Sequence, residues 1–223
     1  MDSIQVRNSI ARIYDRFTIP SGLRLHMYRV ASVAGMICDN LNGVSVNSGN
    51  VVAACLLHDL GNIVKFEISK DQFPGLLGAD GKGIDYWQEV KKKVIARYGG
   101  VDHVATHNML SELGVDSRLI LIIDSMGGIF NGSSTDMEAD ICSYSDCRVG
   151  PSGVMSVTDR VNDFYKRYMI SSDPALRARA LELRLSLSRI LDVERRIFSD
   201  ARIRPEQIND KSIKPYLDRY MKR

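Results

Sequence analysis

The chain has 223 residues, of which 44% are apolar and 26% charged, and its formal net charge is +3. These fractions are ordinary for a soluble globular protein, and so small a charge does not by itself indicate nucleic-acid or membrane binding. The four cysteines form no CxxC pair, which disfavours a disulfide framework or a cysteine-rich zinc site. No segment has the pattern of a signal peptide or a membrane span, so we expect a cytoplasmic protein.

The first part of the chain has the three- and four-residue apolar spacing of helices. This spacing predicts helices over 4–17 and 23–41, separated by a break at Pro20-Ser21-Gly22. His26 lies at the edge of the inward stripe of the second helix. A side chain that coordinates a buried metal would need such a position.

The segment from Asn50 to Leu60 is almost entirely apolar and is predicted to be a central buried helix. Gly61 is typical of a left-handed helix terminator, which would place His58 and Asp59 in the last helical turn. Packing gives an apolar helix no reason to end on an imidazole beside a carboxylate. A divalent metal would explain this ending, because imidazole and carboxylate are both suitable ligands and a buried carboxylate without a partner is energetically costly.

The remainder of the chain also reads as helical, with no internal repeat. Loops rich in glycine or serine cover about 66–84 and 125–135, and we expect them to set specificity. The apolar spacing predicts further helices over 85–98, 102–113, 116–124, 135–147, 156–170, 174–199 and 209–221.

We therefore expect an all-α protein with one main domain over residues 1–170. The helices of residues 171–223 would pack on this domain or extend it. From Pro174 onward the chain carries 13 Lys and Arg against 7 Asp and Glu, which is typical of a solvated helical face. These C-terminal helices could also form a homodimer.

His26, the His58–Asp59 pair and the distant Asp146 follow one another in the order H…HD…D. With the apolar helix before His58 and the segment Tyr144–Val149 around Asp146, this pattern resembles the HD superfamily of metal-dependent phosphohydrolases. The resemblance covers about residues 22–168. It implies an α-helical bundle, a bound divalent metal and hydrolysis of phosphate esters, commonly nucleotides.

The same resemblance implies that His26, His58, Asp59 and Asp146 are the metal ligands. Two imidazoles and two carboxylates would leave open positions for water and a phosphate oxygen, and the metal would lower the pKa of that water. Ligand type alone does not choose among Mn, Fe, Co, Ni, Mg and Zn. Asp59 would in addition orient or deprotonate the water.

Other charged residues are weaker candidates for the same chemistry. Lys65 could neutralise phosphate charge and Glu67 could protonate a leaving oxygen; the bacterial 5′-deoxynucleotidases of the superfamily have acidic catalytic residues in this stretch. Asn62 stands where one such branch has Glu. Arg148 and Arg160 could bind phosphate oxygens, although a surface salt bridge is the usual role of such residues.

His103 and His107 lie four residues apart on one predicted helix, which is a spacing found among metal ligands. His103 resembles the first of two histidines that bind a second metal in some HD proteins. The usual second histidine is absent near Asp124, which disfavours a dinuclear site. His103 and Asp124 are the candidates for a second metal or a phosphate contact.

Our main hypothesis is a mononuclear phosphohydrolase whose partner is a small phosphorylated substrate, such as a nucleotide. One alternative is a metal-stabilised nucleotide-binding or regulatory module without turnover. Another is a dinuclear HD phosphodiesterase, which would need the second metal. RNA association through the basic C-terminal part has little support, since basic and aromatic residues do not alternate there.

Overall fold

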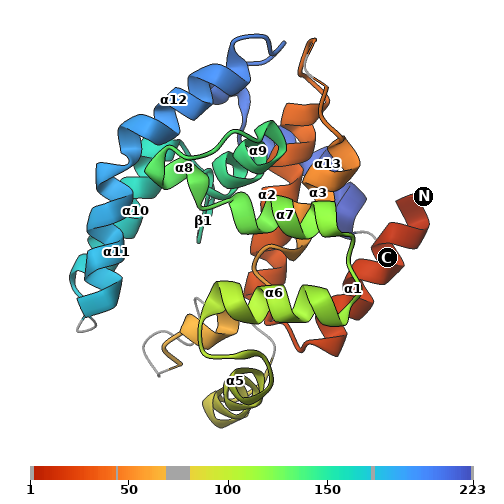
Figure 1. Ribbon diagram of the computed structural model, residues 1–223, viewed down its shortest axis with the longest axis vertical. Coiled ribbons are helices and arrows are strands. Elements are labelled where there is room, and N and C mark those ends of the chain that lie inside the picture. Colours follow the sequence, from red (N-terminus) through yellow and green to blue (C-terminus); the bar gives the residue numbers. More distant parts are fainter. Residues whose placement is uncertain (1–2, 44, 69–80, 172–173, 222–223) are drawn as a thin grey trace.

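The computed structural model describes residues 3–43, 45–68, 81–171 and 174–221, and nearly all of its regular structure is helical (Figure 1). The prediction of an all-α protein is therefore confirmed. The elements before the C-terminal helices are α1 (Ser3–Arg16), α2 (Ser21–Cys38), α3 (Ser48–Leu57), η1 (Asn62–Lys65), α5 (Ile84–Tyr98), α6 (Asp102–Glu112), α7 (Ser117–Ser125), α8 (Gly128–Asn131) and α9 (Met137–Asp146).

The remaining elements begin with a two-stranded antiparallel hairpin that the sequence did not predict, in which Val149 pairs with Val154. They are β1 (Val149–Gly150), β2 (Gly153–Val154), α10 (Val157–Met169), α11 (Pro174–Leu185), α12 (Leu187–Phe198), η2 (Pro205–Gln207) and α13 (Asp210–Met221). In the described part of the chain, no helix combines the length and apolarity needed to cross a membrane.

The centre of the molecule is formed by α2, α3 and α9, which pack against one another. Asn47 caps the start of α3 by accepting a hydrogen bond from the backbone N–H of Asn50, so the apolar helix begins where its side chains can enter the core. Val51 and Ala54 on α3 have no exposed surface. The hydroxyl of Tyr14 on α1 donates to the carbonyl of Leu56 at 2.7 Å, and this hydrogen bond links α1 to the end of α3.

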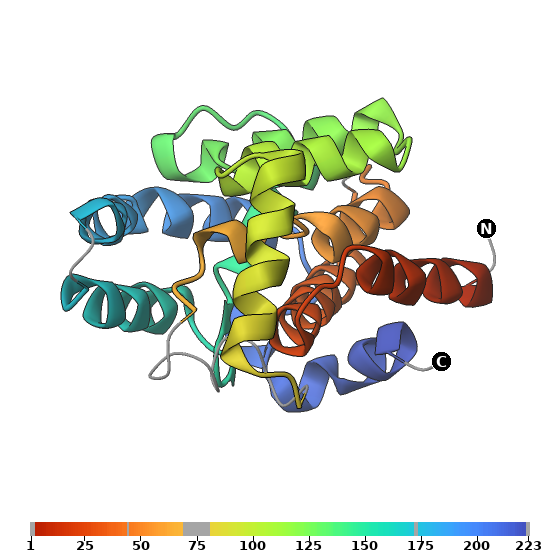
Figure 2. The same cartoon turned by 90° about the horizontal axis from the view of Figure 1, so that it is seen from below.

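The other helices surround this centre. Helix α7 packs on α3, α12 packs on α8 and α9, and α13 packs on α2. Helix α5 lies against η1 and α6 and crosses the front of the view in Figure 2. Two of the C-terminal helices therefore contact the central helices directly, whereas a domain boundary at residue 170 stays a prediction.

The single helix predicted over 174–199 is wrong, because the structure divides it into α11 and α12. Ser186 separates them, and its hydroxyl donates to the carbonyl of Glu182 at 2.8 Å. The backbone N–H of Ser186 also donates to the carbonyl of Glu182, at 3.0 Å, so a helical hydrogen bond persists where the two helices meet. In the same way, the loop predicted over 125–135 contains the short helix α8. Most of the other predicted loop, residues 69–80, lies outside the described residues.

Candidate metal centre

His58 is the most buried of the four predicted ligands, with 5% of its side chain exposed. Helix α3 ends at Leu57, three residues before the predicted end at Leu60, and His58 follows as its C-cap. The Nδ1 atom of His58 lies 2.9 Å from the carbonyl oxygen of Cys55. Since a carbonyl only accepts, Nδ1 carries the proton and the lone pair of the neutral ring is on Nε2.

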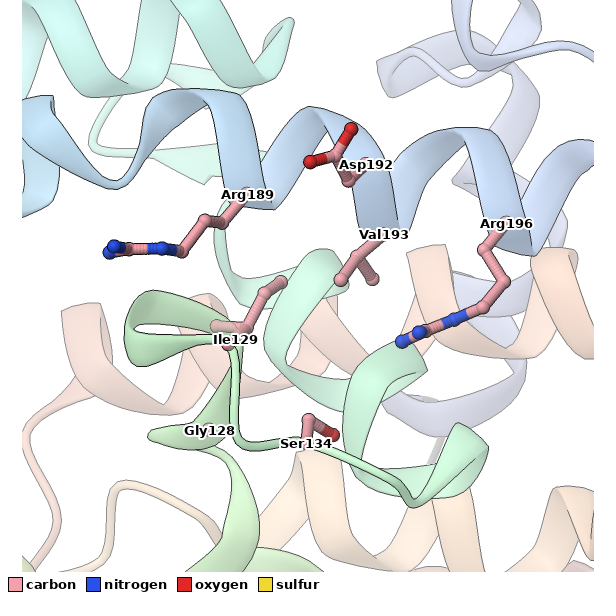
Figure 3. A pocket seen from close by; sticks show the side chains of 8 residues that line it. Gly128, Ile129, Ser134, Arg189, Asp192, Val193 and Arg196 are labelled. Carbon is pink, nitrogen blue, oxygen red and sulfur yellow. The ribbon is translucent and has the colours of Figure 1, made fainter.

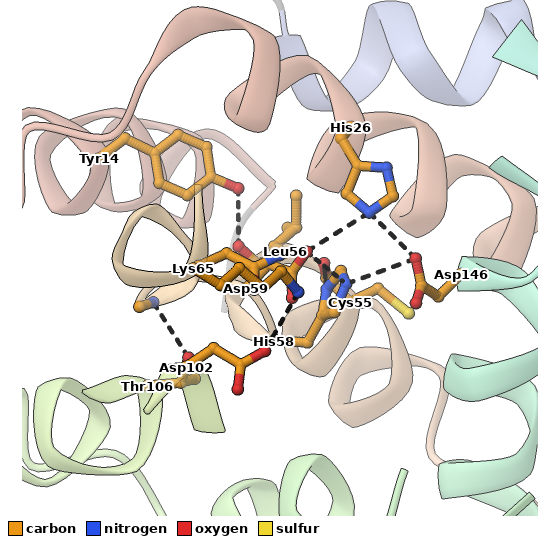
Figure 4. A network of polar contacts seen from close by, with 12 residues as sticks. Tyr14, His26, Cys55, Leu56, His58, Asp59, Lys65, Asp102, Thr106 and Asp146 are labelled. Carbon is orange, nitrogen blue, oxygen red and sulfur yellow. Dashed lines mark hydrogen bonds and ion pairs between the residues drawn. The ribbon is translucent and has the colours of Figure 1, made fainter. Parts of the chain in front are cut away.

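The Nε2 atom of His58 faces two carboxylates without reaching a hydrogen-bond partner (Figure 4). It lies 3.5 Å from Oδ2 of Asp59 and 3.8 Å from Oδ1 of Asp146. His26, from the first turns of α2, brings its Nε2 to 3.0 Å from Asp146 Oδ1 and 3.6 Å from Asp59 Oδ2. The four side chains thus converge from α2, from the turn after α3, and from the last residue of α9.

These residues fit a divalent ion. One ligand atom from each of His26, His58 and Asp146 can be chosen so that all three lie within 4.8 Å of one another, and Asp59 faces both histidines from the side. Buried polar atoms in native proteins are normally satisfied. An ion coordinated by His58 Nε2 would satisfy the unpartnered atom, and the Nδ1 contact to Cys55 is the outer-shell bond that orients metal-binding histidines.

The charges of the site favour the ionised forms of His58 and Asp146 in the metal-free protein. Burial lowers the pKa of His58, but the carboxylates of Asp59 and Asp146 outweigh this effect and raise it to about 9. For Asp146, removal from water raises the pKa, but the contacts with His26 and His58 hold it well below the usual range of a carboxyl group. A metal ion would therefore have to displace a proton from His58.

The turn after α3 differs from the one that the sequence predicted. Gly61 is not left-handed, because its φ of −85° lies in the ordinary right-handed region. Glycine is needed there for space: a Cβ atom would lie 2.5 Å from the backbone N of Thr106 and 2.7 Å from the carbonyl oxygen of Asp102. The Gly61 N–H also donates to Thr106 Oγ1 at 3.0 Å, so α6 packs directly on the turn that carries Asp59.

Comparison with protein families agrees with this geometry, since residues 24–99 match the model of the HD domain. These residues are therefore similar to an HD domain. HD domains bind divalent metals, and the match agrees with the resemblance to the HD superfamily of metal-dependent phosphohydrolases. The matched segment includes His26, His58 and Asp59, whereas Asp146 lies beyond it. The chain matches no curated protein and no solved structure.

Lys65 and Glu67 follow the metal cluster in sequence, but the structure does not bring them into it. Lys65 donates to Asp102 Oδ2 at 3.1 Å, at the first residue of α6. Glu67 is exposed, and its charge acts on the ammonium group of Lys91. Their catalytic roles stay predictions.

The residues predicted for a second metal are not brought together. His103 has 81% of its side chain exposed, and its Nδ1 lies 3.5 Å from Oδ1 of Asp102. Asp124 instead contacts Nδ1 of His107 at 3.0 Å, and this pair lies on the surface. Among the described residues, one cluster of three or more ligands is present, and it contains neither His103 nor Asp124. A second metal or a phosphate contact at His103 and Asp124 stays a prediction.

Arg148 lies in a structural position, and its predicted contact with a substrate stays a prediction. It is buried, and its guanidinium group donates to the hydroxyl of Tyr144 and to the carbonyls of Met155, Pro205 and Ile208. These bonds hold the segment before α13 against the centre of the molecule and leave little capacity for a phosphate.

Arg160 lies on α10, where its Nη1 is 3.6 Å from Asp163 Oδ2 and its guanidinium stands 5.7 Å from the ring centre of Phe164. The Nη1 atom is buried without a hydrogen-bond partner. A substrate contact by Arg160 stays a prediction.

The loop over 125–135 lines a pocket that shares no residue with the metal cluster. This pocket, of about 210 Å³, lies between α8 and α12 (Figure 3). Arg189 and Arg196 point to opposite sides of it, with Ile129 and Val193 between them. Arg189 donates to a backbone carbonyl and Arg196 pairs with a buried aspartate. The two cations therefore do not form a phosphate clamp.

Asn62 was not identified from the sequence as a residue that contacts a predicted metal ligand. Asn62 is buried and donates through Nδ2 to Asp59 Oδ2 at 2.5 Å. The signal was present in the sequence, since a polar amide stands three residues after Asp59 between buried apolar residues.

Proposed function

We propose that this protein is a metal-dependent hydrolase of phosphate esters that acts on a small phosphomonoester, such as a nucleotide. One divalent ion would be held by His26, His58, Asp59 and Asp146. The observation that carries the proposal is the buried Nε2 atom of His58, which has no hydrogen-bond partner and faces two carboxylates. His58 also lies in the segment that matches the HD-domain model.

The residues of this chain would divide the work as follows. A divalent ion bound there supplies Lewis acidity and lowers the pKa of a coordinated water. The carbonyl of Cys55 keeps His58 in the tautomer whose Nε2 lone pair is free to bind the ion. Asp146 holds the His26 ring close to Nε2 of His58. The Asp59 carboxylate would orient the attacking water and accept its proton.

A substrate screen on the metal-reconstituted full chain tests this proposal. We expect turnover of phosphomonoesters, with p-nitrophenyl phosphate and the nucleoside monophosphates as probes. Asp59→Asn should lower kcat by about 100-fold or more, in line with the loss of a general base. Asp218→Asn, which removes an exposed carboxylate that pairs with Lys214 on α13, should leave kcat unchanged and serves as the control.

The outcome separates the alternative functions. Hydrolysis of bis-p-nitrophenyl phosphate in preference to the monoester would favour a phosphodiesterase. Binding of one metal per chain without turnover of any probe would refute the hydrolase and leave a metal-stabilised binding module.

A further inference from the structure

The backbone itself brings Asn62 to Asp59. The N–H of Asn62 donates to the carbonyl of Asp59 at 3.0 Å, which closes the turn between α3 and η1. Within that turn, the side-chain amide of Asn62 reaches Oδ2 of Asp59 at 2.5 Å. Asn62 is 6% exposed, so water has little access to this bond.

The oxygen that receives this hydrogen bond is also the one that faces the histidines. Oδ2 of Asp59 lies 3.6 Å from His26 Nε2 and 3.5 Å from His58 Nε2. A carboxylate oxygen has two lone pairs, so it can accept from the amide and still bind an ion. The opposite orientation of the Asn62 amide would set its oxygen against Asp59, which is electrostatically unfavourable.

We propose that Asn62 is a positioning residue that sets the metal affinity of the site. Its amide fixes the rotation of the Asp59 carboxylate so that Oδ2 points at the two Nε2 atoms before any ion arrives. Without this bond, the carboxylate can rotate away, and metal binding has to pay for ordering it. Outer-shell partners of metal ligands commonly act in this way.

This inference rests on the metal site of the proposed function but does not depend on hydrolysis. Its test is therefore the dissociation constant of Mn²⁺ or Co²⁺ for the metal-free full chain, measured by competition with a chelator. We expect Asn62→Ala and Asn62→Leu to weaken binding by about 10- to 100-fold. The Leu variant nearly preserves the side-chain volume, so it separates the loss of the hydrogen bond from the loss of packing.

Asn40→Ala is the matched control. Asn40 is also partly buried, and its side chain donates to the carbonyl of Met36. It lies just after the C-terminal end of α2, whereas His26 lies near the start of that helix. The metal affinity of Asn40→Ala should equal that of the wild type. The thermal midpoint of each metal-free variant establishes that it is folded.

Three other results would have different meanings. Wild-type affinity in Asn62→Leu would overturn the positioning role, whether or not Asn62→Ala binds weakly, because packing alone would then account for the effect. No metal binding by the wild type would overturn the metal site together with this inference. Metal binding that depends on Asn62, without turnover of any phosphate ester, would refute only the proposed hydrolytic function.

Discussion

The close contact between Gly61 and α6 predicts that Gly61→Ala destabilises the protein. The three atoms nearest to the added Cβ would lie at 2.5–2.7 Å, and two of them belong to the backbone of α6. Overpacking typically costs about 1–3 kcal/mol, and we take about 3 kcal/mol because backbone cannot rotate away. Replacing glycine at a right-handed φ recovers about 0.4–1 kcal/mol from the unfolded state.

The net loss is therefore about 2 kcal/mol, which for a chain of this length lowers Tm by about 4–8 °C. Thermal unfolding followed by circular dichroism measures it, on metal-free protein to avoid stabilisation by ligand. Gly127→Ala is the control, since Gly127 has a φ of −62° and nothing within 4 Å of an added Cβ. Its Tm should be unchanged or higher. A Tm for Gly61→Ala within 1 °C of wild type would refute the packing argument.

Three further predictions concern individual side chains. Asp146→Ala should reduce metal affinity by more than about 100-fold, beyond the usual effect of an outer-shell change. Metal content after dialysis measures this loss, and a full complement of metal in the variant would contradict the proposed ligand set. Arg148→Ala should lower the free energy of unfolding by about 3 kcal/mol or more, because it leaves buried carbonyls unpaired. Its metal affinity should stay at the wild-type value, and a weaker affinity in the folded variant would indicate that Arg148 acts at the metal site. For Asp102, burial raises the pKa, but Lys65 and Arg179 lower it to about 2, so its stabilisation of about 1–2 kcal/mol is present above pH 4 and is lost as the pH falls towards 2. Denaturant unfolding of Asp102→Asn at pH 7 and pH 2.5 checks this, since an equal deficit at both values would exclude the ionic origin.

Much of the candidate metal site could be predicted from the sequence, because its chemistry depends on residue types that are unusual in their context. His58 and Asp59 end an apolar segment, and His26 lies at the edge of an apolar stripe. Charged and imidazole groups in such places need a partner, and a metal is one that suits both.

Two local features could not be predicted from the sequence patterns. Periodicity cannot reveal that the helix is divided at Ser186, since the same residues suit one continuous helix. The φ of Gly61 could not be predicted either: glycine after a helix usually signals a left-handed cap, whereas here it leaves room for α6.

By itself, the sequence determined the helical class and the identity of the side chains that could bind a metal. Apolar spacing and residue chemistry are local properties, so they can be read without a structure. Only the tertiary structure decided which candidates meet. It brought Asp146 to His26 from the end of α9, directed Arg148 to the carbonyls before α13, and left His103 in solvent. Such choices depend on how helices pack, and the contacts that fix the packing join residues far apart in the chain.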